Sequence, residues 1–219
     1  IKVKRDEKET QLAEFAMRER LQTDLMDMVI HDIRTPLGTV KMSLALLADE
    51  AGDDRYYAKG RHPTGYGEPG LFDGMSQGAG FGFRGSRTSG GIGLLADLQG
   101  ADRYQAGHFS QGGGYYFGWG LLYEGTGNDT YMGSRYAQGF AAHQAVGYFE
   151  DAGGDDRYGT RQGVAQGCSS WDETTLAFLE RGGNDVYDGG FSGQGASAQN
   201  GFCLFVDYGG DDVYRGGTA

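Results

Sequence analysis

Residues 121–131, LLYEGTGNDTY, and residues 204–214, LFVDYGGDDVY, show the pattern that decides the fold of this 219-residue chain. In both, an apolar pair precedes an acid, and Gly-x-Asp-x-Tyr begins three residues after that acid. The pattern occurs six times, with its tyrosine at Tyr56, Tyr104, Tyr131, Tyr158, Tyr187 and Tyr214. After a first interval of 48 residues, the tyrosines recur every 27–29 residues. A Gln-Gly dipeptide repeats at a similar period, at Gln77, Gln111, Gln138, Gln166 and Gln194.

A unit of about 27 residues that is rich in glycine is too short for a four-stranded propeller blade, and it lacks the long stretches of helical repeats. It predicts one coil of a β-solenoid, with short strands and glycine at the corners; a β-roll or another all-β repeat is the alternative. Coils would stack about 4.8 Å apart, with apolar pairs and aromatic rings in the core. The predicted fold class is therefore mainly β, a glycine-rich β-solenoid of about six coils preceded by one long amphipathic α-helix.

Composition separates two parts of the chain. Of the 42 glycines, 41 follow residue 48, and the whole net charge of −11 lies in residues 49–219. The glycines do not keep the period of three found in collagen, and the 26 Phe and Tyr residues are too many for a solvated linker. The negative charge argues against nucleic acid as a partner. No apolar run is long enough to span a membrane, and no signal peptide is expected at this N-terminus.

The N-terminal part predicts a helix. Residues 8–35 contain neither Gly nor Pro, and Leu21, Leu25 and Met28 form one apolar stripe beside a second stripe of Met26, Val29 and Ile33. Such a wide face needs a partner, so we expect a homodimer through this helix, which would continue to about Leu46 or Leu47. The predicted domains are 1–45, the helix, and 46–219, the solenoid. Because the sequence begins at Ile1 and stops within a repeat, we expect it to be a piece of a longer chain.

Residues 31–37, HDIRTPL, resemble the H-box of the histidine-kinase dimerisation and phosphoacceptor domain. The resemblance implies that His31 is the phosphoacceptor and that the neighbouring Asp32 orients its imidazole and accepts its proton. It also implies that Arg34, Thr35 and Pro36 shape the kinked turn beside the histidine. The second helix and the ATP-binding domain of that family are not found in this sequence. Whether the chain has enzymatic activity therefore stays open, and His31 would be phosphorylated only in trans.

The resemblance implies two-component signal transduction in bacteria, with a separate ATP-bearing kinase domain or a response regulator as partner. Its alternative is a non-enzymatic solenoid that is structural or binds calcium or a glycan. A kinase-like helix would place the protein in the cytoplasm, whereas the repeats are typical of secreted or cell-surface proteins. The sequence does not decide between a natural fusion and an engineered joining of these two parts.

Two interpretations of the repeated acids remain open. The aspartates of Gly-x-Asp would form one column at about 4.8 Å intervals, and the earlier acids of the repeats, from Asp49 to Asp207, would form a second. Like charges so placed destabilise a sheet. The Gly-x-Asp aspartates are Asp54, Asp102, Asp129, Asp156, Asp185 and Asp212. One interpretation is a calcium site, because the Gly-x-Asp segments resemble the calcium nonapeptide of RTX β-rolls, although here the motif appears once per coil. In the other, each aspartate caps its own turn and Arg55, Arg103 and Arg157 neutralise the charge.

Other candidate residues are less specific. The repeats also resemble the Gly-Asp-Asp-x-Tyr repeats of certain bacterial proteins, which implies no activity. His62, His108 and His143 lack the spacing of metal ligands, and Cys168 and Cys203 form neither a metal motif nor a disulfide framework. An aromatic set would either form a strip that stacks on sugar rings or pack in the core. It consists of Tyr115, Tyr116, Phe117, Trp119 and Trp171.

Overall fold

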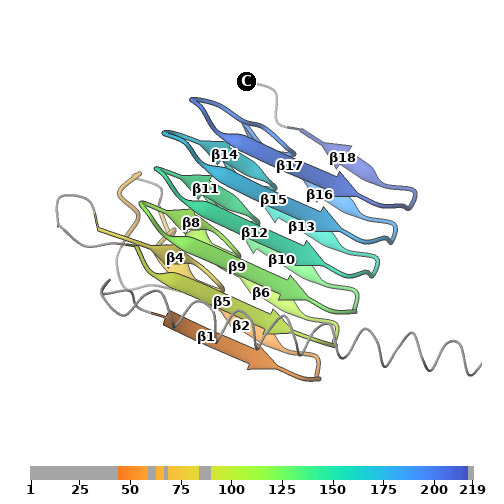
Figure 1. The fold of residues 1–219 in the computed structure, drawn as a ribbon. Coiled ribbons are helices and arrows are strands. Elements are labelled where there is room, and N and C mark those ends of the chain that lie inside the picture. The colour runs from red at the N-terminus through yellow and green to blue at the C-terminus, as the bar shows by residue number, and fades with distance from the viewer. Residues whose placement is uncertain (1–43, 59–62, 67–68, 84–89, 217–219) are drawn as a thin grey trace, which may run out of the picture. The chain divides into compact units, whose positions relative to one another are not determined.

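The computed structural model describes residues 44–58, 63–66, 69–83 and 90–216 of the chain, and these form a parallel β-solenoid (Figure 1). The first sheet consists of β1 (Leu44–Asp49), β5 (Ile92–Asp97), β9 (Trp119–Glu124), β12 (Val146–Asp151), β15 (Thr175–Glu180) and β17 (Phe202–Asp207). The second consists of β2 (Arg55–Tyr57), β6 (Arg103–Gln105), β10 (Thr130–Gly133), β13 (Arg157–Thr160), β16 (Val186–Asp188) and β18 (Val213–Arg215). The third consists of β4 (Gly80–Phe81), β8 (Gly114–Tyr115), β11 (Phe140–Ala142) and β14 (Cys168–Ser170), and β3 (Asp73–Ser76) pairs with β7 (His108–Ser110).

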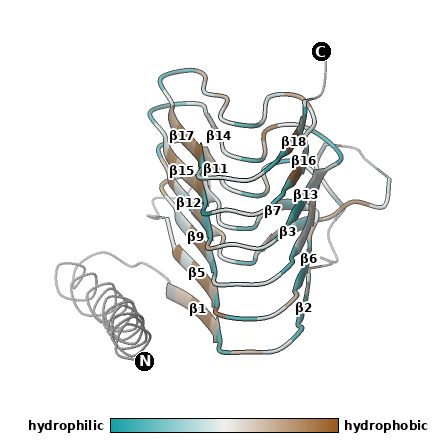
Figure 2. Ribbon diagram, turned by 90° about the vertical axis from the view of Figure 1, so that its right-hand side faces the viewer, coloured by the Kyte–Doolittle hydropathy of each residue, from teal (hydrophilic) through white to brown (hydrophobic). Residues whose placement is uncertain are grey.

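Each coil passes through the sheets in the same order, so equivalent residues of successive coils pair in register. In the first sheet, for example, Leu95 pairs with Leu122, and Phe149 pairs with Phe178. Viewed along the strands, the first and second sheets form opposite walls of the coil, joined at one end by the Gly-x-Asp turns (Figure 2). The repeat therefore acts as one structural unit that is stacked along the solenoid axis.

The predicted solenoid is confirmed, but the predicted fold class is wrong in its helical part and in its length. The described residues contain no helix, and Leu44–Asp49 form a strand where the amphipathic helix was expected to continue. This strand pairs with β5 along its whole length, with Leu46 opposite Leu94, so pairing with the next coil replaces the helical hydrogen bonds. There are five complete turns, followed by β17 and β18 alone. The rest of the predicted helix lies outside the described residues, and the boundary at residue 45 stays a prediction.

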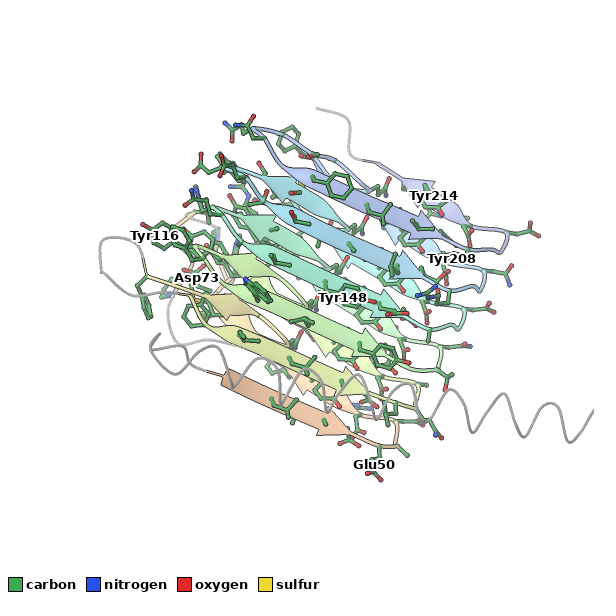
Figure 3. The ribbon with its side chains drawn as sticks, viewed as in Figure 1. Glu50, Asp73, Tyr116, Tyr148, Tyr208 and Tyr214 are labelled. Carbon is green, nitrogen blue, oxygen red and sulfur yellow. The ribbon has the colours of Figure 1, made fainter. Side chains whose placement is uncertain are left out.

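The core between the first two sheets is a pair of aromatic and aliphatic ladders. The six repeat tyrosines stack with ring centroids 4.7–4.9 Å apart and planes within 9° of parallel. Phe149, Phe178 and Phe205 make a second stack at 4.7 Å, and Leu95 and Leu122 extend it. The predicted coil spacing is confirmed, but of each apolar pair only the second residue, such as Leu95 or Leu122, enters the core, because strand side chains alternate. Tyr208 and Tyr214 lie in the last coil (Figure 3), where the ring of Tyr214 is exposed because no described strand covers it.

The Gln-Gly glutamines bind successive coils together from inside. The side-chain amide of Gln138 donates to the carbonyl oxygens of Tyr131 in its own coil and Gly159 in the next. Gln111 does the same with Tyr104 and Met132. The glutamines have φ of 52–61°. Each corner therefore has a left-handed backbone conformation that glycine would adopt more easily. The carbonyl oxygen of Met132 also accepts the amide of Ala106, so Gln111 adds a bond between coils to the backbone pairing.

The glycines of Gly-x-Asp are needed because the turns of adjacent coils touch. A Cβ on Gly127 would lie 1.5 Å from the carbonyl oxygen of Gly100, and one on Gly154 would lie 1.4 Å from that of Gly127. Any side chain at these positions would therefore force the coils apart. The described part of the chain contains no helix of the length and hydropathy needed to cross a membrane.

Replacing Gly127 with alanine should lower the free energy of unfolding by about 3–5 kcal/mol, because the added methyl group cannot be placed without separating two coils. Gly65→Ala is the control, since no atom lies within 4 Å of a Cβ there, and it should change stability by less than about 0.5 kcal/mol. Urea unfolding monitored by circular dichroism would measure both. Equal effects of the two substitutions would contradict the observed stacking of the turns.

Candidate functional site: a buried carboxyl ladder

Two columns of acids face each other inside the coil, beside the Gly-x-Asp turns. The first acids end the strands of the first sheet and are Asp97, Glu124, Asp151, Glu180 and Asp207. The second acids are the aspartates of Gly-x-Asp, namely Asp54, Asp102, Asp129, Asp156, Asp185 and Asp212. A first acid points inward because it is two residues beyond a core residue such as Leu122, and strand side chains alternate. The middle members are almost completely inaccessible, with exposures of 0–2 % from Asp97 to Asp185.

The second acids connect one coil to the next through the backbone. The Oδ1 atom of Asp156 accepts a hydrogen bond from the amide of Asp129 at 2.6 Å, and Oδ1 of Asp129 accepts one from the amide of Asp102, also at 2.6 Å. The same bond joins Asp185 to the amide of Asp156 at 2.7 Å. Each second acid therefore binds the turn of the preceding coil, not its own turn as the capping interpretation requires.

Turn capping belongs to the first acids instead. Oδ1 of Asp151 accepts the amide of Gly153 at 3.2 Å, and Asp207 does the same with Gly209. The other carboxylate oxygen of Asp151 accepts the hydroxyl groups of Tyr131 at 2.7 Å and Tyr158 at 3.0 Å. The tyrosine ladder therefore connects the packed core to the acids by hydrogen bonds.

One oxygen of each middle second acid accepts no hydrogen bond from an amide or a hydroxyl group, although the carboxyl groups of Asp156 and Asp185 lie against those of Asp151 and Glu180. That oxygen is the Oδ2 atom of Asp102, Asp129, Asp156 and Asp185. Each of these residues is less than 3 % exposed, so water does not hydrate the free oxygen. A buried carboxylate oxygen without a partner is costly, which indicates that a proton or a cation belongs beside it.

The two columns combine into five groups of three carboxyl groups. In each group the oxygen atoms lie within 4.8 Å of one another. The groups are Asp54–Asp97–Asp102, Asp102–Glu124–Asp129, Asp129–Asp151–Asp156, Asp156–Glu180–Asp185 and Asp185–Asp207–Asp212. Each group takes one first acid and two second acids from adjacent coils, so neighbouring groups share a carboxyl group. The three middle groups are buried, whereas Asp54 and Asp212 at the two ends are half-buried.

Burial raises the pKa of the carboxyl groups of Asp102, Glu124, Asp129, Asp151, Asp156, Glu180 and Asp185. Desolvation and the nearby acids raise the pKa of Glu124 to about 9 and that of Asp129 to about 7. The same two causes raise the pKa of Asp156, for which Asp151 is the main charged neighbour. The pKa of Asp151 is raised by burial although two tyrosines and a backbone amide stabilise its charged form. Without a bound cation, several of these groups hold a proton at pH 7.

The arginines do not neutralise the ladder. Arg55, Arg103 and Arg157 alternate with the inward tyrosines, so they point to the outer face of the second sheet, where they are exposed. Within the described residues none of them forms an ion pair with a second acid. Arg181 is paired instead with Glu150, its Nη2 lying 2.8 Å from Oε1. The neutralising role expected for these three arginines is therefore wrong.

The remaining candidate residues are scattered. His31, Asp32, Arg34, Thr35 and Pro36 lie outside the described residues, as does His62. His108 is buried against the ring of Tyr66, and Nδ1 of His143 lies 3.0 Å from a carboxylate oxygen of Asp172.

The aromatic set is divided between the surface and the third-sheet core. Tyr115 and Trp171 pack against the core of that sheet, whereas Phe117 and Trp119 are 44 % and 47 % exposed. Tyr116 lies at the corner that follows β8 (Figure 3) and has a φ of 46°. These side chains do not form one continuous exposed strip.

The first acids were missed as candidate ligands. The sequence feature that marks them is the acid before every Gly-x-Asp, but only the tertiary structure brings the two acids side by side.

No family model matches the chain, and no curated protein or solved structure is significantly similar to it. The structure itself assigns the described part to the class of β-solenoid repeat proteins.

Without divalent cations, stability should fall as the pH rises from 5 to 9. Acids with raised pKa bind more protons when folded than when unfolded, so their stabilising effect is complete below pH 4 and is lost as the pH passes their folded pKa values. The expected slope is about 1.4 kcal/mol per pH unit for each proton retained. Urea unfolding in EDTA at pH 5, 7 and 9 would measure it. Constant or rising stability over this range would show that the folded ladder holds no more protons than the unfolded chain.

Proposed function

We propose that this chain is a non-enzymatic β-solenoid that binds calcium between its coils through the buried carboxyl ladder. The observation that carries the proposal is the row of buried Oδ2 atoms on Asp102, Asp129, Asp156 and Asp185 that accept no hydrogen bond from an amide or a hydroxyl group. Calcium accepts oxygen ligands from carboxylates in flexible geometries, so it would complete these groups. The resemblance of the turns to the RTX nonapeptide points to the same ion.

The spacing of the oxygens is suitable for calcium. Opposite oxygens around Ca²⁺ lie about 4.8 Å apart, twice a typical ligand distance of about 2.4 Å. The oxygens of each three-carboxyl group lie within 4.8 Å of one another. A site between two coils would take Asp129, Asp151 and Asp156 as ligands. The hydroxyl group of Tyr131 already donates a hydrogen bond to the carboxylate of Asp151.

The charge balance also favours divalent ions. Eleven carboxyl groups form the five groups, and one Ca²⁺ in each would nearly neutralise them. The carboxyl groups would then remain ionised at neutral pH, because the bound ions would cancel the repulsion between carboxylates that otherwise raises their pKa. Calcium and protons are therefore the two alternative ways to stabilise the same stack of coils.

Calcium should raise the Tm at pH 8 by about 5–10 °C when its concentration is about 100 times the dissociation constant, because binding to the folded state alone stabilises it. Asp156→Asn should reduce this effect, since Asp156 belongs to two of the five groups. The same substitution should stabilise the calcium-free protein at pH 9, because the amide is neutral and can donate to Asp151. Scanning calorimetry with calcium and with EDTA would measure both.

Asp155→Asn is the matched control, because the carboxylate of Asp155 is exposed and bonds to Asn184 on the outside of the turn. It should preserve the calcium response. Isothermal titration should give five ions for the wild type and three for Asp156→Asn. A Tm that does not respond to calcium, or an equal response in Asp156→Asn, would refute the proposal.

A second candidate function is supported by the sequence alone. The HDIRTPL motif at residues 31–37 matches the H-box pattern at every position. On this proposal His31 accepts a phosphoryl group in trans from a separate ATP-bearing domain, and Asp32 takes the imidazole proton during the transfer. Residues 8–43, which precede β1, would then belong to the signalling lineage and dimerise the chain.

Incubation with a histidine-kinase ATP-binding domain and labelled ATP would test this function. We expect acid-labile, base-stable phosphate on the wild type and less than a tenth of that amount on His31→Gln. His143→Gln is the control, since His143 lies in the solenoid beside Asp172. Equal labelling of the wild type and His31→Gln, or no labelling of either by kinase domains that label a known substrate, would exclude the phosphoacceptor role.

A further inference from the structure

A cleft of about 350 Å³ lies on the outer face of the second sheet, on the opposite side of that sheet from the carboxyl ladder. Its floor includes Gln105 on β6 and Met132 on β10, which pair in register. Residues 70–72 form one wall, held against the coil where the amide of His108 donates to the carbonyl of Phe72 at 2.9 Å. Residues 70–72 therefore help to make this part of the outer face concave.

Two arginines line this cleft. Arg103 comes from the start of β6, and Arg161 follows β13. Both side chains are exposed, and within the described residues neither forms an ion pair. Their guanidinium groups are therefore available to a ligand, and each carries donors arranged to bind a carboxylate or a phosphate through two hydrogen bonds.

The charge of the surroundings makes this cleft distinctive. Eleven of the 30 acids belong to the ladder, so the remaining acids balance the 19 Lys and Arg residues and the rest of the chain carries about as many negative as positive charges. Yet none of the described residues that line the cleft is acidic. Cations concentrated in a concave site attract anions more strongly than scattered surface charges, because the walls restrict solvent screening.

An aromatic side chain completes the site. Tyr57 lines the cleft and is 62 % exposed, whereas Tyr56, the residue before it in β2, packs against the core. An exposed tyrosine offers an apolar face to a ring and a hydroxyl group for hydrogen bonding. A site with two guanidinium groups and one such ring is typical of sites that bind a compact organic anion.

We propose that this cleft binds a small anionic ligand through a carboxylate or a phosphate, with Arg103 and Arg161 of the lining as its cationic contacts. Tyr57 contacts the body of the ligand, and Gln105 offers polar atoms at the floor. Acidic sugars and phosphorylated metabolites share this chemistry. The site is separate from the carboxyl ladder, so binding there does not depend on calcium.

Isothermal titration of the full chain at low ionic strength would test the proposal with three probes: a galacturonate tetramer, a neutral galactose tetramer and inorganic phosphate. We expect the galacturonate tetramer or phosphate to bind, and the galactose tetramer to bind at least tenfold more weakly. Arg103→Gln and Arg161→Gln should each raise the dissociation constant about tenfold, the effect of losing a charged hydrogen-bond pair. Tighter binding of the galacturonate tetramer would identify a sugar acid, and tighter binding of phosphate a phosphorylated ligand.

Arg157→Gln provides the matched control. Arg157 lies in the same outward position of the second sheet as Arg103, since both pair with Thr130, but it does not line the cleft. Its replacement should change the dissociation constant by less than twofold. Circular dichroism would confirm that all three variants keep the solenoid. Failure of both anionic probes to bind, equal binding of the neutral tetramer, or equal effects of Arg157→Gln and Arg103→Gln would overturn the proposal.

Discussion

The in-register stacking of parallel coils is the constraint on which the rest of the structure depends. Equivalent residues lie about 4.8 Å apart, as the tyrosine centroids at 4.7–4.9 Å show. At this spacing each repeat position has only its own copies as close neighbours along the axis. A residue is therefore acceptable at a position only if it packs well against itself, which planar rings and the amides of Gln138 and Gln166 can do.

The same constraint makes the acids the exceptional feature of this solenoid. A repeated carboxylate also stacks on itself, but with repulsion and with the additional cost of burial. Backbone amides satisfy one oxygen of each second acid from Asp102 onward, and tyrosine hydroxyl groups satisfy part of each first acid other than Glu180. These bonds leave the Oδ2 atoms of Asp129 and Asp156 without a hydrogen bond from an amide or a hydroxyl group. Neutralisation by protons or by a divalent cation is thus a condition for stacking the coils, so ligand binding and stability are linked.

Much of the solenoid could be predicted because its period is local. Tyr104 to Tyr131 and Gln111 to Gln138 both span 27 residues, and such a spacing indicates stacked repeats before any contact is known. The helix prediction was wrong at Leu44–Asp49 because the apolar spacing there suits both structures, and the pairing of Leu46 with Leu94 selects the strand. The turn-capping interpretation failed because Asp156 and Gly154 are close in sequence, whereas the amide that Asp156 binds is 27 residues away in Asp129.

The sequence by itself determined the repeat, its glycine corners, the identity of its ladders and the presence of two acids in each coil. Only the tertiary structure decided that acids five residues apart, such as Glu124 and Asp129, face each other inside the coil and join an acid of the preceding coil. It also decided that Arg103 points away from them into a cleft that residues 70–72 help to form. The physical reason is that periodicity specifies which residues are equivalent, whereas the curvature of the turn and the alternation of the strand specify which residues meet.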